Sequence, residues 1–371
     1  MLGIKVNSTW LILRRLALVL ITLTLGATQA VASTVAPEFV YTANQIAHNV
    51  SAYKINPATG ALQEVRGSPY PAGKFPISVT VDPAGHFAYV ANQGSSSISA
   101  YKIHPETGAL KEIAGSPYKT DTHPLAVVVG AAGKFIYVTA RESRHVAAFK
   151  INPHSGALTA VGHPAVTQEN PLSVAIDPKD RFAYVANYDS NTLSVYKINA
   201  RSGALRAAGP AIATDVHPIF AAVDLTGKFV YVANYGSTTV LAYQINQQSG
   251  ALTAVPGSPF TVGPRPYSIS IEPKDHYMYV ANWSDNTVTA HAIDPNTGAL
   301  TPVSAGRTAT GSYPYAVAVD PSGHFAYVAN NGAGDISAYT VDAKSGVLHL
   351  VDGSPFASGK GPYSLVTTTT H

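Results

Sequence analysis

The chain has 371 residues, of which 24 are Lys or Arg and 21 are Asp or Glu, so its formal charge is +3. Lys5, Arg14 and Arg15 supply that excess, and the first 32 residues contain no acid, so the rest of the chain is formally neutral. This balance argues against a nucleic-acid or membrane-surface partner. The absence of cysteine excludes disulfides, thiolate metal sites and a lipid-modified N-terminus.

The N-terminal segment has the pattern of a secretory signal peptide. Its three basic residues precede an apolar run from Leu16 to Leu25, and Ala30-Val31-Ala32 forms a small-x-small site before Ser33. We predict that residues 1–32 are removed and that the mature protein is secreted or periplasmic, without a membrane span. A retained membrane anchor is the alternative, because the segment from Trp10 to Leu13 could extend an apolar run that is too short by itself to cross a bilayer.

Residues 33–371 are dominated by an internal repeat. The tetrapeptide Tyr-Val-Ala-Asn or a close variant occurs seven times, at steps of 47 or 48 residues, beginning at Tyr41, Tyr89, Tyr137, Tyr184, Tyr231, Tyr279 and Tyr327. A nearly constant period in the forties, filled with short strands and turns and lacking a helical pattern, is typical of a β-propeller. We therefore predict one all-β domain with seven blades.

Each repeat contains four strand-like runs, which are clearest at 315–320, 325–330, 336–341 and 347–351. These runs are rich in β-branched and aromatic residues or alternate between apolar and polar side chains. A Thr/Ser-Gly-Ala-Leu turn recurs with its glycine at a fixed place, which predicts a positive φ there. The repeated asparagines, such as Asn92 and Asn187, are expected to be turn residues whose amides bind the loop backbone.

The two ends of the chain predict how the ring closes. The first repeat begins at Phe39-Val40-Tyr41 without the Pro-x-Ser-Val strand that precedes the others, and the missing strand occurs near the C-terminus at Pro362 to Val366. One blade is therefore expected to combine three N-terminal strands with one C-terminal strand. This arrangement pairs strand edges that would otherwise be open.

The repeat unit Pro-x-Ser-Val-x-Val-Asp-Pro-x-Gly-x-Phe-x-Tyr-Val-Ala-Asn, as at Pro76 to Asn92, resembles the unit of YVTN-repeat propellers. It also resembles the wider family of seven-bladed lactonases, which includes one type of 6-phosphogluconolactonase and the muconate-lactonising cyclases. The resemblance spans Phe39 to Val366. It implies a seven-bladed ring and, as one activity, hydrolysis of a cyclic ester.

The lactonases of that family carry a His-x-His pair, an Arg-His pair and a glutamate that follows an asparagine after a Tyr-Val strand. The first histidine of His-x-His corresponds to His123 or equally to His217, but Leu125 or Ile219 replaces the second. The Arg-His pair has no counterpart, and Arg141-Glu142 is the nearest approach to the Asn-Glu pair. These departures favour a non-catalytic role over lactonase activity.

The position just before the repeated proline is expected at the mouth of the central channel, because the first strand of each blade lines the channel in propellers of this type. The seven residues at this position, which we call the mouth ring, are Phe75, His123, Asn170, His217, Arg265, Tyr313 and Gly361. Because the blades are nearly identical, a purely structural role at this position would require similar residues in all seven blades. The variation indicates a role outside the blades.

A second ring, which we call the collar, follows the Tyr-Val-Ala-Asn strand and consists of Gln45, Gln93, Arg141, Tyr188, Tyr235, Trp283 and Asn331. Together with Tyr267, Tyr315 and Tyr363 it is expected to form an aromatic and polar surface suited to sugars, lactones or peptides. An arginine there would orient a carboxylate or phosphate, and a neutral histidine could deprotonate water.

Two functions from different classes follow. The first is a lactonase-type hydrolase that uses His123 or His217 as base and Arg265 or Arg141 for an anionic group or oxyanion. Its ligand would be bound by Asn170, Tyr313, Arg141, Tyr188, Tyr235, Tyr267, Trp283 and Tyr315. The second is a non-catalytic propeller that binds a glycan, peptide or partner protein through the same face. In either case we predict a monomer without a cofactor, and without a metal because the mouth ring contains no acid.

Overall fold

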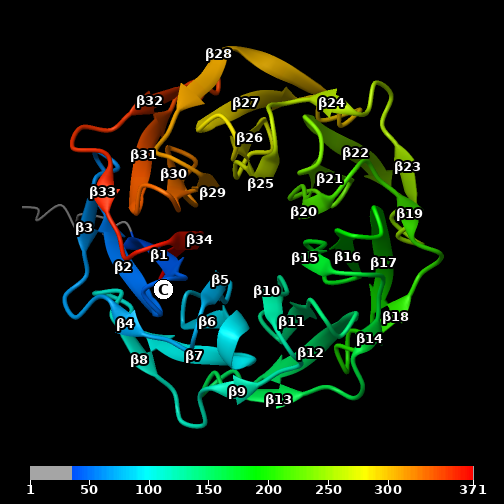
Figure 1. The fold of residues 1–371 in the computed structure, drawn as a ribbon, viewed down its shortest axis with the longest axis horizontal. Helices are drawn as coiled ribbons and strands as arrows, with labels where there is room; N and C mark the ends of the chain where they lie inside the picture. The colour runs from blue at the N-terminus through cyan, green and yellow to red at the C-terminus, as the bar shows by residue number, and fades with distance from the viewer. Residues whose placement is uncertain (1–35, 371) are drawn as a thin grey trace, which may run out of the picture. The chain divides into compact units, whose positions relative to one another are not determined.

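The computed structural model describes residues 36–370, which form seven antiparallel sheets around a central axis (Figure 1). The predicted signal peptide, residues 1–32, lies outside the described residues. Within 36–370 no helix is long and apolar enough to cross a membrane. The inner strands of the seven sheets face the middle of the ring, as the sequence predicts for a propeller.

The strands are numbered in chain order and grouped here by blade. Blade 1 consists of β34 (Pro362–Thr369), β1 (Glu38–Asn44), β2 (Asn49–Ile55), β3 (Leu62–Glu64) and β4 (Tyr70–Pro71). Blade 2 consists of β5 (Pro76–Val81), β6 (Phe87–Asn92), the 3-10 turn η1 (Gln93–Ser95), β7 (Ser97–Ile103), β8 (Leu110–Glu112) and β9 (Tyr118–Lys119). Blade 3 consists of β10 (Pro124–Val129), β11 (Phe135–Ala140), β12 (His145–Ile151), β13 (Leu158–Ala160) and β14 (Ala165–Val166).

Blades 4 to 7 follow the same plan. Blade 4 consists of β15 (Pro171–Ile176), β16 (Phe182–Asn187), β17 (Thr192–Ile198), β18 (Leu205–Ala207) and β19 (Ile212–Ala213), and blade 5 of β20 (Pro218–Val223), β21 (Phe229–Asn234), β22 (Thr239–Ile245), β23 (Leu252–Ala254) and β24 (Phe260–Thr261). Blade 6 consists of β25 (Pro266–Ile271), β26 (Tyr277–Asn282), β27 (Thr287–Ile293) and β28 (Leu300–Ala309). Blade 7 consists of β29 (Pro314–Val319), β30 (Phe325–Asn330), β31 (Asp335–Val341), β32 (Leu348–Leu350) and β33 (Phe356–Ala357).

The predicted four-stranded blade is confirmed, with one addition at its outer edge. In six blades the outer strand is interrupted, so a short strand such as β8 and a two-residue strand such as β9 both pair with the third strand. In blade 6 the two merge into the ten-residue β28, which pairs with β27 along its length except for a register shift near His291.

The predicted ring closure is also confirmed. β34 pairs antiparallel with β1, with Phe39 opposite Thr368 and Tyr41 opposite Val366. The C-terminal segment thus becomes the inner strand of a blade that the N-terminal strands began. It also leaves no open edge between β1 and the channel.

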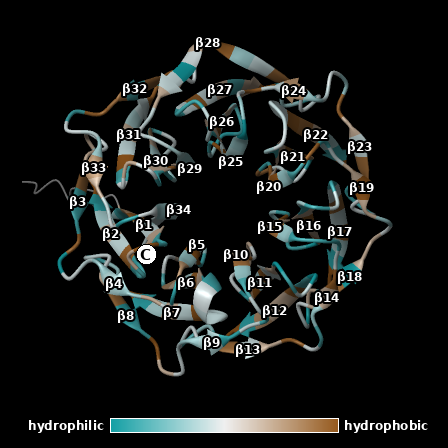
Figure 2. Ribbon diagram, viewed as in Figure 1, coloured by the Kyte–Doolittle hydropathy of each residue, from teal (hydrophilic) through white to brown (hydrophobic). Residues whose placement is uncertain are grey.

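The core is distributed between neighbouring blades rather than gathered in one place. Seven clusters of buried apolar side chains recur around the ring, and hydrophobic segments accordingly occur in every blade (Figure 2). The tyrosine of the repeated tetrapeptide is fully buried, and in six blades its hydroxyl donates to the carbonyl of the turn glycine in the next blade, as from Tyr41 to Gly108 at 2.8 Å. That glycine has a positive φ, as predicted, and a Cβ at Gly108 would lie 2.3 Å from the ring of Phe39.

The prediction that the repeated asparagines are turn residues is wrong, although the amide oxygen of Asn92 accepts a loop N–H, that of Gly73 at 3.1 Å, as predicted. Each is the last residue of a second strand and is fully buried, as at Asn92 and Asn187. In five blades the amide nitrogen donates to a hydroxyl seven residues later on the third strand, as from Asn92 to Ser99 at 2.9 Å. Since the strand continues to the asparagine, its amide holds the hairpin together next to the channel mouth.

Candidate functional site at the channel mouth

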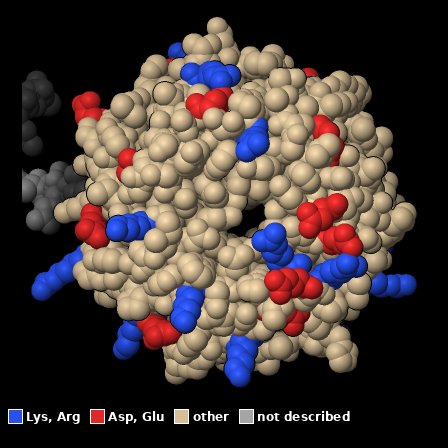
Figure 3. Space-filling view, in the orientation of Figure 1, with Lys and Arg blue, Asp and Glu red and all other residues tan. Residues whose placement is uncertain are grey.

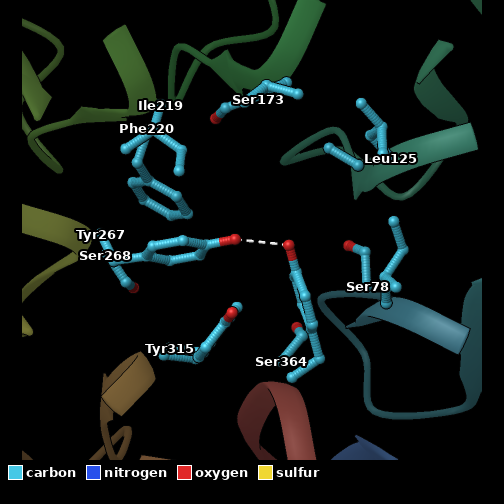
Figure 4. Close-up of a pocket in the computed structure, with 14 residues that line it drawn as sticks. Ser78, Leu125, Ser173, Ile219, Phe220, Tyr267, Ser268, Tyr315 and Ser364 are labelled. Carbon is cyan, nitrogen blue, oxygen red and sulfur yellow. Dashed lines mark hydrogen bonds between the residues drawn. The ribbon is translucent and has the colours of Figure 1, made fainter. Parts of the chain in front are cut away.

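The channel wall consists of the two residues that follow each repeated proline. They enclose a cavity of about 110 Å³ and comprise Ile77, Ser78, Leu125, Ala126, Leu172, Ser173, Ile219, Phe220, Tyr267, Ser268, Tyr315, Ala316, Tyr363 and Ser364 (Figure 4). Sites for small organic ligands usually measure roughly 300–1,000 Å³. The channel itself is therefore too narrow for a sugar-sized ring.

The serines of this wall have a structural role. The hydroxyl of Ser78 accepts the backbone N–H of Val127 at 3.2 Å, and Ser173 accepts that of Ala221 at the same distance. Ser268 and Ser364 make equivalent contacts with their neighbouring blades. These hydroxyls join adjacent inner strands, which argues against a nucleophilic serine.

Three tyrosines occupy one side of the channel. The ring of Tyr315 lies 4.4 Å from that of Tyr267 and 4.6 Å from that of Tyr363, and the hydroxyls of Tyr267 and Tyr363 are hydrogen-bonded (Figure 4). Burial raises the pKa of Tyr363 to about 12 and that of Tyr267 well above its ordinary value. The phenols are therefore neutral near pH 7. The sequence prediction placed these tyrosines with the collar, but they lie in the channel wall and meet the collar through the ring of Tyr235, 5.9 Å from that of Tyr267.

All seven residues of the mouth ring share one backbone conformation. The six non-glycine members have φ between 50° and 55°, and Gly361 has φ 68°. Each carbonyl accepts the N–H of the collar residue of its own blade at 2.7–3.1 Å, as from Arg141 to His123. A left-handed conformation costs a residue with a Cβ about 1–2 kcal/mol, and only glycine avoids that cost. The repeat thus fixes the backbone here, and six blades retain a side chain at a site that favours glycine.

Blades 4 to 7 form what we call the aromatic side of the mouth, in which the mouth-ring residues of blades 5 to 7 each lie on the collar residue of the preceding blade. His217 stacks on Tyr188 with ring centroids 4.3 Å apart and planes at 4°. The guanidinium of Arg265 lies 5.4 Å from the ring centroids of both Tyr235 and Trp283. Tyr313 stacks on Trp283 at 4.8 Å. The aromatic side therefore contains Tyr188, His217, Tyr235, Arg265, Trp283 and Tyr313.

Blade 3 forms the charged side. Nδ1 of His123 lies 3.0 Å from Oε1 of Glu142, and Arg144 pairs with Glu169 nearby. Figure 3 shows basic and acidic side chains gathered beside the central opening, over β10–β12 and β15–β17. Burial raises the pKa of Tyr363, and the positive charge of Arg141 opposes part of that rise.

The structure groups the predicted site residues unevenly. His217 and Arg265 lie together on the aromatic side, whereas His123 belongs to the charged side, two blades from His217. Asn170 is buried, and its Oδ1 has no hydrogen-bond partner within 36–370. Glu142 was not among the predicted site residues, although its place in the nearest approach to the family's Asn-Glu pair was a signal for it. Across the described residues, no three His, Asp or Glu side chains gather as a metal site requires.

A family model described as a seven-bladed β-propeller lactonase matches residues 24–121, 112–217, 210–310 and 269–366. The chain belongs to this lactonase family. No match was found among curated protein sequences.

Several solved structures have the same fold. A candidate 6-phosphogluconolactonase from Bacteroides uniformis has a TM-score of 0.79 at 16% identity, covering 90% of this chain and 100% of that one. A second candidate, from Bacteroides fragilis, has a TM-score of 0.78 at 20% identity, covering 91% and 99%. The periplasmic gluconolactonase of Pseudomonas aeruginosa has a TM-score of 0.77 at 19% identity, covering 90% and 100%. At these identities the similarity shows the fold alone.

Proposed function

We propose that the protein is an exported lactone hydrolase whose reaction centre is His123, oriented by Glu142 and assisted by Arg141. The contact of 3.0 Å between His123 Nδ1 and Glu142 Oε1 carries the proposal. A carboxylate at Nδ1 holds the proton on that nitrogen and leaves the lone pair of Nε2 for a water molecule. Both side chains are well exposed, at 42% and 60%, so the pair adds little stability and its use is in orienting the imidazole.

The reaction that these residues support is general-base hydrolysis of a cyclic ester. His123 Nε2 takes a proton from water as the oxygen attacks the ester carbonyl, and Glu142 stabilises the imidazolium that forms. Arg141, which has no carboxylate partner within 36–370, stabilises the oxyanion of the tetrahedral intermediate. When the ring C–O bond breaks, the imidazolium returns its proton to the leaving oxygen, and the product is an open-chain hydroxy acid.

His217 and Arg265 have a different role in this proposal. The imidazole of His217 is stacked on Tyr188 and has no carboxylate partner within residues 36–370, so it suits a ligand face better than a base. Arg265 is held by Tyr235 and Trp283, on the side of the mouth away from the dyad. We therefore assign both residues to ligand binding, together with Tyr188, Tyr235, Trp283 and Tyr313.

A non-catalytic role is the second candidate, because the family's Arg-His pair is missing and the aromatic side is a binding surface in its own right. A screen of the mature chain, residues 33–371, separates the two. Aldonolactones, γ-butyrolactone and δ-valerolactone would be tested by pH-stat titration, with the chain alone and with His123→Gln and Glu142→Gln. We expect at least one lactone to be opened, with a loss of about 10²-fold or more for His123→Gln.

Arg144→Gln is the matched control for this screen, because it removes a charge of the same blade outside the dyad. Its rate should remain within about twofold of the parent. Hydrolysis that is unchanged by His123→Gln would refute the assignment of the base. No turnover of any lactone by a folded chain would favour the non-catalytic role.

Export is part of the proposal and rests on the pattern of residues 1–32. The periplasmic location stated for the Pseudomonas aeruginosa structure supports it only by likeness of fold. Expression of the full chain in a Gram-negative host, followed by fractionation and intact mass, tests it. We expect a periplasmic protein whose mass corresponds to a start at Ser33, and a full-length product in the membrane fraction would favour a retained anchor.

A further inference from the structure

A groove opens on the rim of the mouth, beside the channel rather than in it. Its volume is about 440 Å³, within the range of small-molecule sites, and Tyr188, His217, Tyr235, Gly236, Ser237, Thr238, Pro264, Arg265 and Ser284 line it. We call it the rim groove. Because the channel cavity measures only about 110 Å³, a ring-shaped ligand fits the rim groove and not the channel.

The rim groove has a flat aromatic wall. Tyr188 and His217 stack with their planes only 4° apart, so the pair offers its outer faces and edges, and the ring of Tyr235 lies 6.3 Å from that of Tyr188. Aromatic side chains with polar edges bury the apolar faces of a sugar ring and still hydrogen-bond at the rim. Such a wall suits a saturated ring with C–H groups on one face.

The lining of the groove also includes an arginine, Arg265. Arg144 lies on a loop of blade 3 and Arg307 on the outer strand β28, and each pairs with an acid, Glu169 and Asp285. Arg265 has no ion pair within the described residues; its only side-chain hydrogen bond there is to the Tyr235 hydroxyl at 3.4 Å. The nearby carboxylate of Asp215 is already bonded to the Thr239 hydroxyl and the Val216 N–H.

The floor of the groove is backbone and small hydroxyl side chains. A Cβ at Gly236 would lie 2.6 Å from Cγ1 of Val216, so the chain passes too closely there for any side chain. Thr238 and Ser284 line the groove, and within 36–370 their hydroxyls make no hydrogen bond. They can hydrogen-bond to the hydroxyls of a ligand. A peptide adding as a strand would need an open edge, but the adjacent strands β21 and β22 are both paired on two sides.

We propose that the rim groove binds a sugar ring bearing a carboxylate, a hexuronate, with its apolar face packed against the stacked pair of Tyr188 and His217 and its carboxylate on Arg265. The inference rests on the proposed function in that this ring would be the part of a lactone substrate remote from the ester opened at His123. The substrate class is then a lactone joined to an acidic sugar. Binding energy from such a remote ring can be used at the reacting end.

The test uses sugars that have no ester to hydrolyse. Isothermal titration of the mature chain with galacturonate, digalacturonate and neutral galactose should show binding of the two acids at least tenfold tighter than that of galactose. Arg265→Gln should remove this preference for the acids, and Tyr188→Ala should weaken the binding of all three sugars. Arg307→Gln is the matched control, because its guanidinium is already paired, and it should bind as the parent does.

Failure of this inference differs from failure of the proposed function. Equal affinity of the parent for galacturonate and galactose, no binding of either, or an unchanged preference in Arg265→Gln would each overturn the hexuronate site, whether or not lactones are hydrolysed. Conversely, His123→Gln should bind digalacturonate as the parent does. Arg265-dependent binding in a chain that opens no lactone would support the groove and count against the hydrolase alone.

Discussion

Between the blades, away from the mouth, a tetrapeptide tyrosine donates to a turn glycine of the next blade in six of seven repeats. At the mouth the backbone repeats as faithfully, with the same left-handed φ and the same carbonyl contact in all seven blades, but the side chains differ. The comparison separates two kinds of constraint. Interblade packing selects a residue, whereas the mouth selects only a backbone conformation and leaves the side chain available for function.

The largest effect is expected where the ring closes, since every interblade contact depends on closure. Deletion of residues 361–371 removes β34 and exposes both the inner edge of β1 and the face of blade 7. We expect loss of the cooperative melting transition and aggregation. Circular dichroism melts and size-exclusion chromatography check this, with deletion of His371 alone as the control. A truncated chain that melts within a degree or two of the parent would contradict the closure.

A departure from the repeat inside the blades gives the next effect. His291 occupies the position of Tyr53, Tyr101, Tyr196, Tyr243 and Tyr339, is 2% exposed, and has no hydrogen-bond partner on either nitrogen within 36–370. Burial lowers its pKa from 6.5 to about 4. The unfolded chain binds the proton on His291 more readily than the folded chain does. The free energy of unfolding is therefore unaffected by this group above about pH 6.5 and falls as the pH drops to about 4. The loss reaches about 3 kcal/mol at about 1.36 kcal/mol per pH unit.

His291→Tyr should remove that loss and add a hydrogen bond. The other five tyrosines donate to an outer-strand carbonyl of the preceding blade, as from Tyr243 to Ala213 at 3.2 Å. His291→Phe is the control, because blade 3 carries Phe149 there and the ring cannot titrate. Urea unfolding at pH 4.5 and 7.5 measures the difference from the parent. Burial raises the pKa of Glu38 to about 7, which acts in the opposite direction, but this effect is common to all three proteins. A variant with the same pH dependence as the parent would contradict the prediction.

The tyrosine–glycine bonds offer a matched pair of smaller effects. Tyr231 donates to Gly298 at 3.1 Å, whereas the buried hydroxyl of Tyr184 has no partner in the described chain. Tyr231→Phe leaves a buried carbonyl unsatisfied and should cost about 1–2 kcal/mol of unfolding free energy. Tyr184→Phe removes a hydroxyl that is itself unsatisfied and should be neutral or slightly stabilising. Equal losses in the two variants, measured by urea unfolding, would show that the bonds add nothing to interblade stability.

The same contrast explains what the sequence could and could not predict. The period of the repeat and the displaced strand at Pro362 were sufficient for seven blades and their closure, because each blade repeats one packing pattern. The mouth ring could be located from its place before the proline. The contact between His123 and Glu142 could not be predicted, because it joins two loops of a blade whose side chains vary. Nor was the division between channel wall and collar predicted: Tyr267 lies on the inner strand β25 and Tyr235 in the turn after β21, and the residue type is the same in both.

The smallest stability effects are expected at the mouth, where the loss should fall on the ligand instead. His123→Ala, His217→Ala and Arg265→Ala keep a Cβ in the left-handed conformation, so each should change the unfolding free energy by less than about 1 kcal/mol. Each should nevertheless weaken binding or transition-state stabilisation by about 1–3 kcal/mol where a hydrogen bond to a charged group is lost.

His217→Gly sharpens the test. Glycine relieves the left-handed strain, so this variant should be more stable than His217→Ala by up to about 1 kcal/mol while binding equally poorly. Thermal melts and titration on the same samples give both quantities. If the alanine variants bind and turn over as the parent does with their fold intact, the mouth is not the site, and its side chains have no role that blade 1 does not fulfil with Gly361.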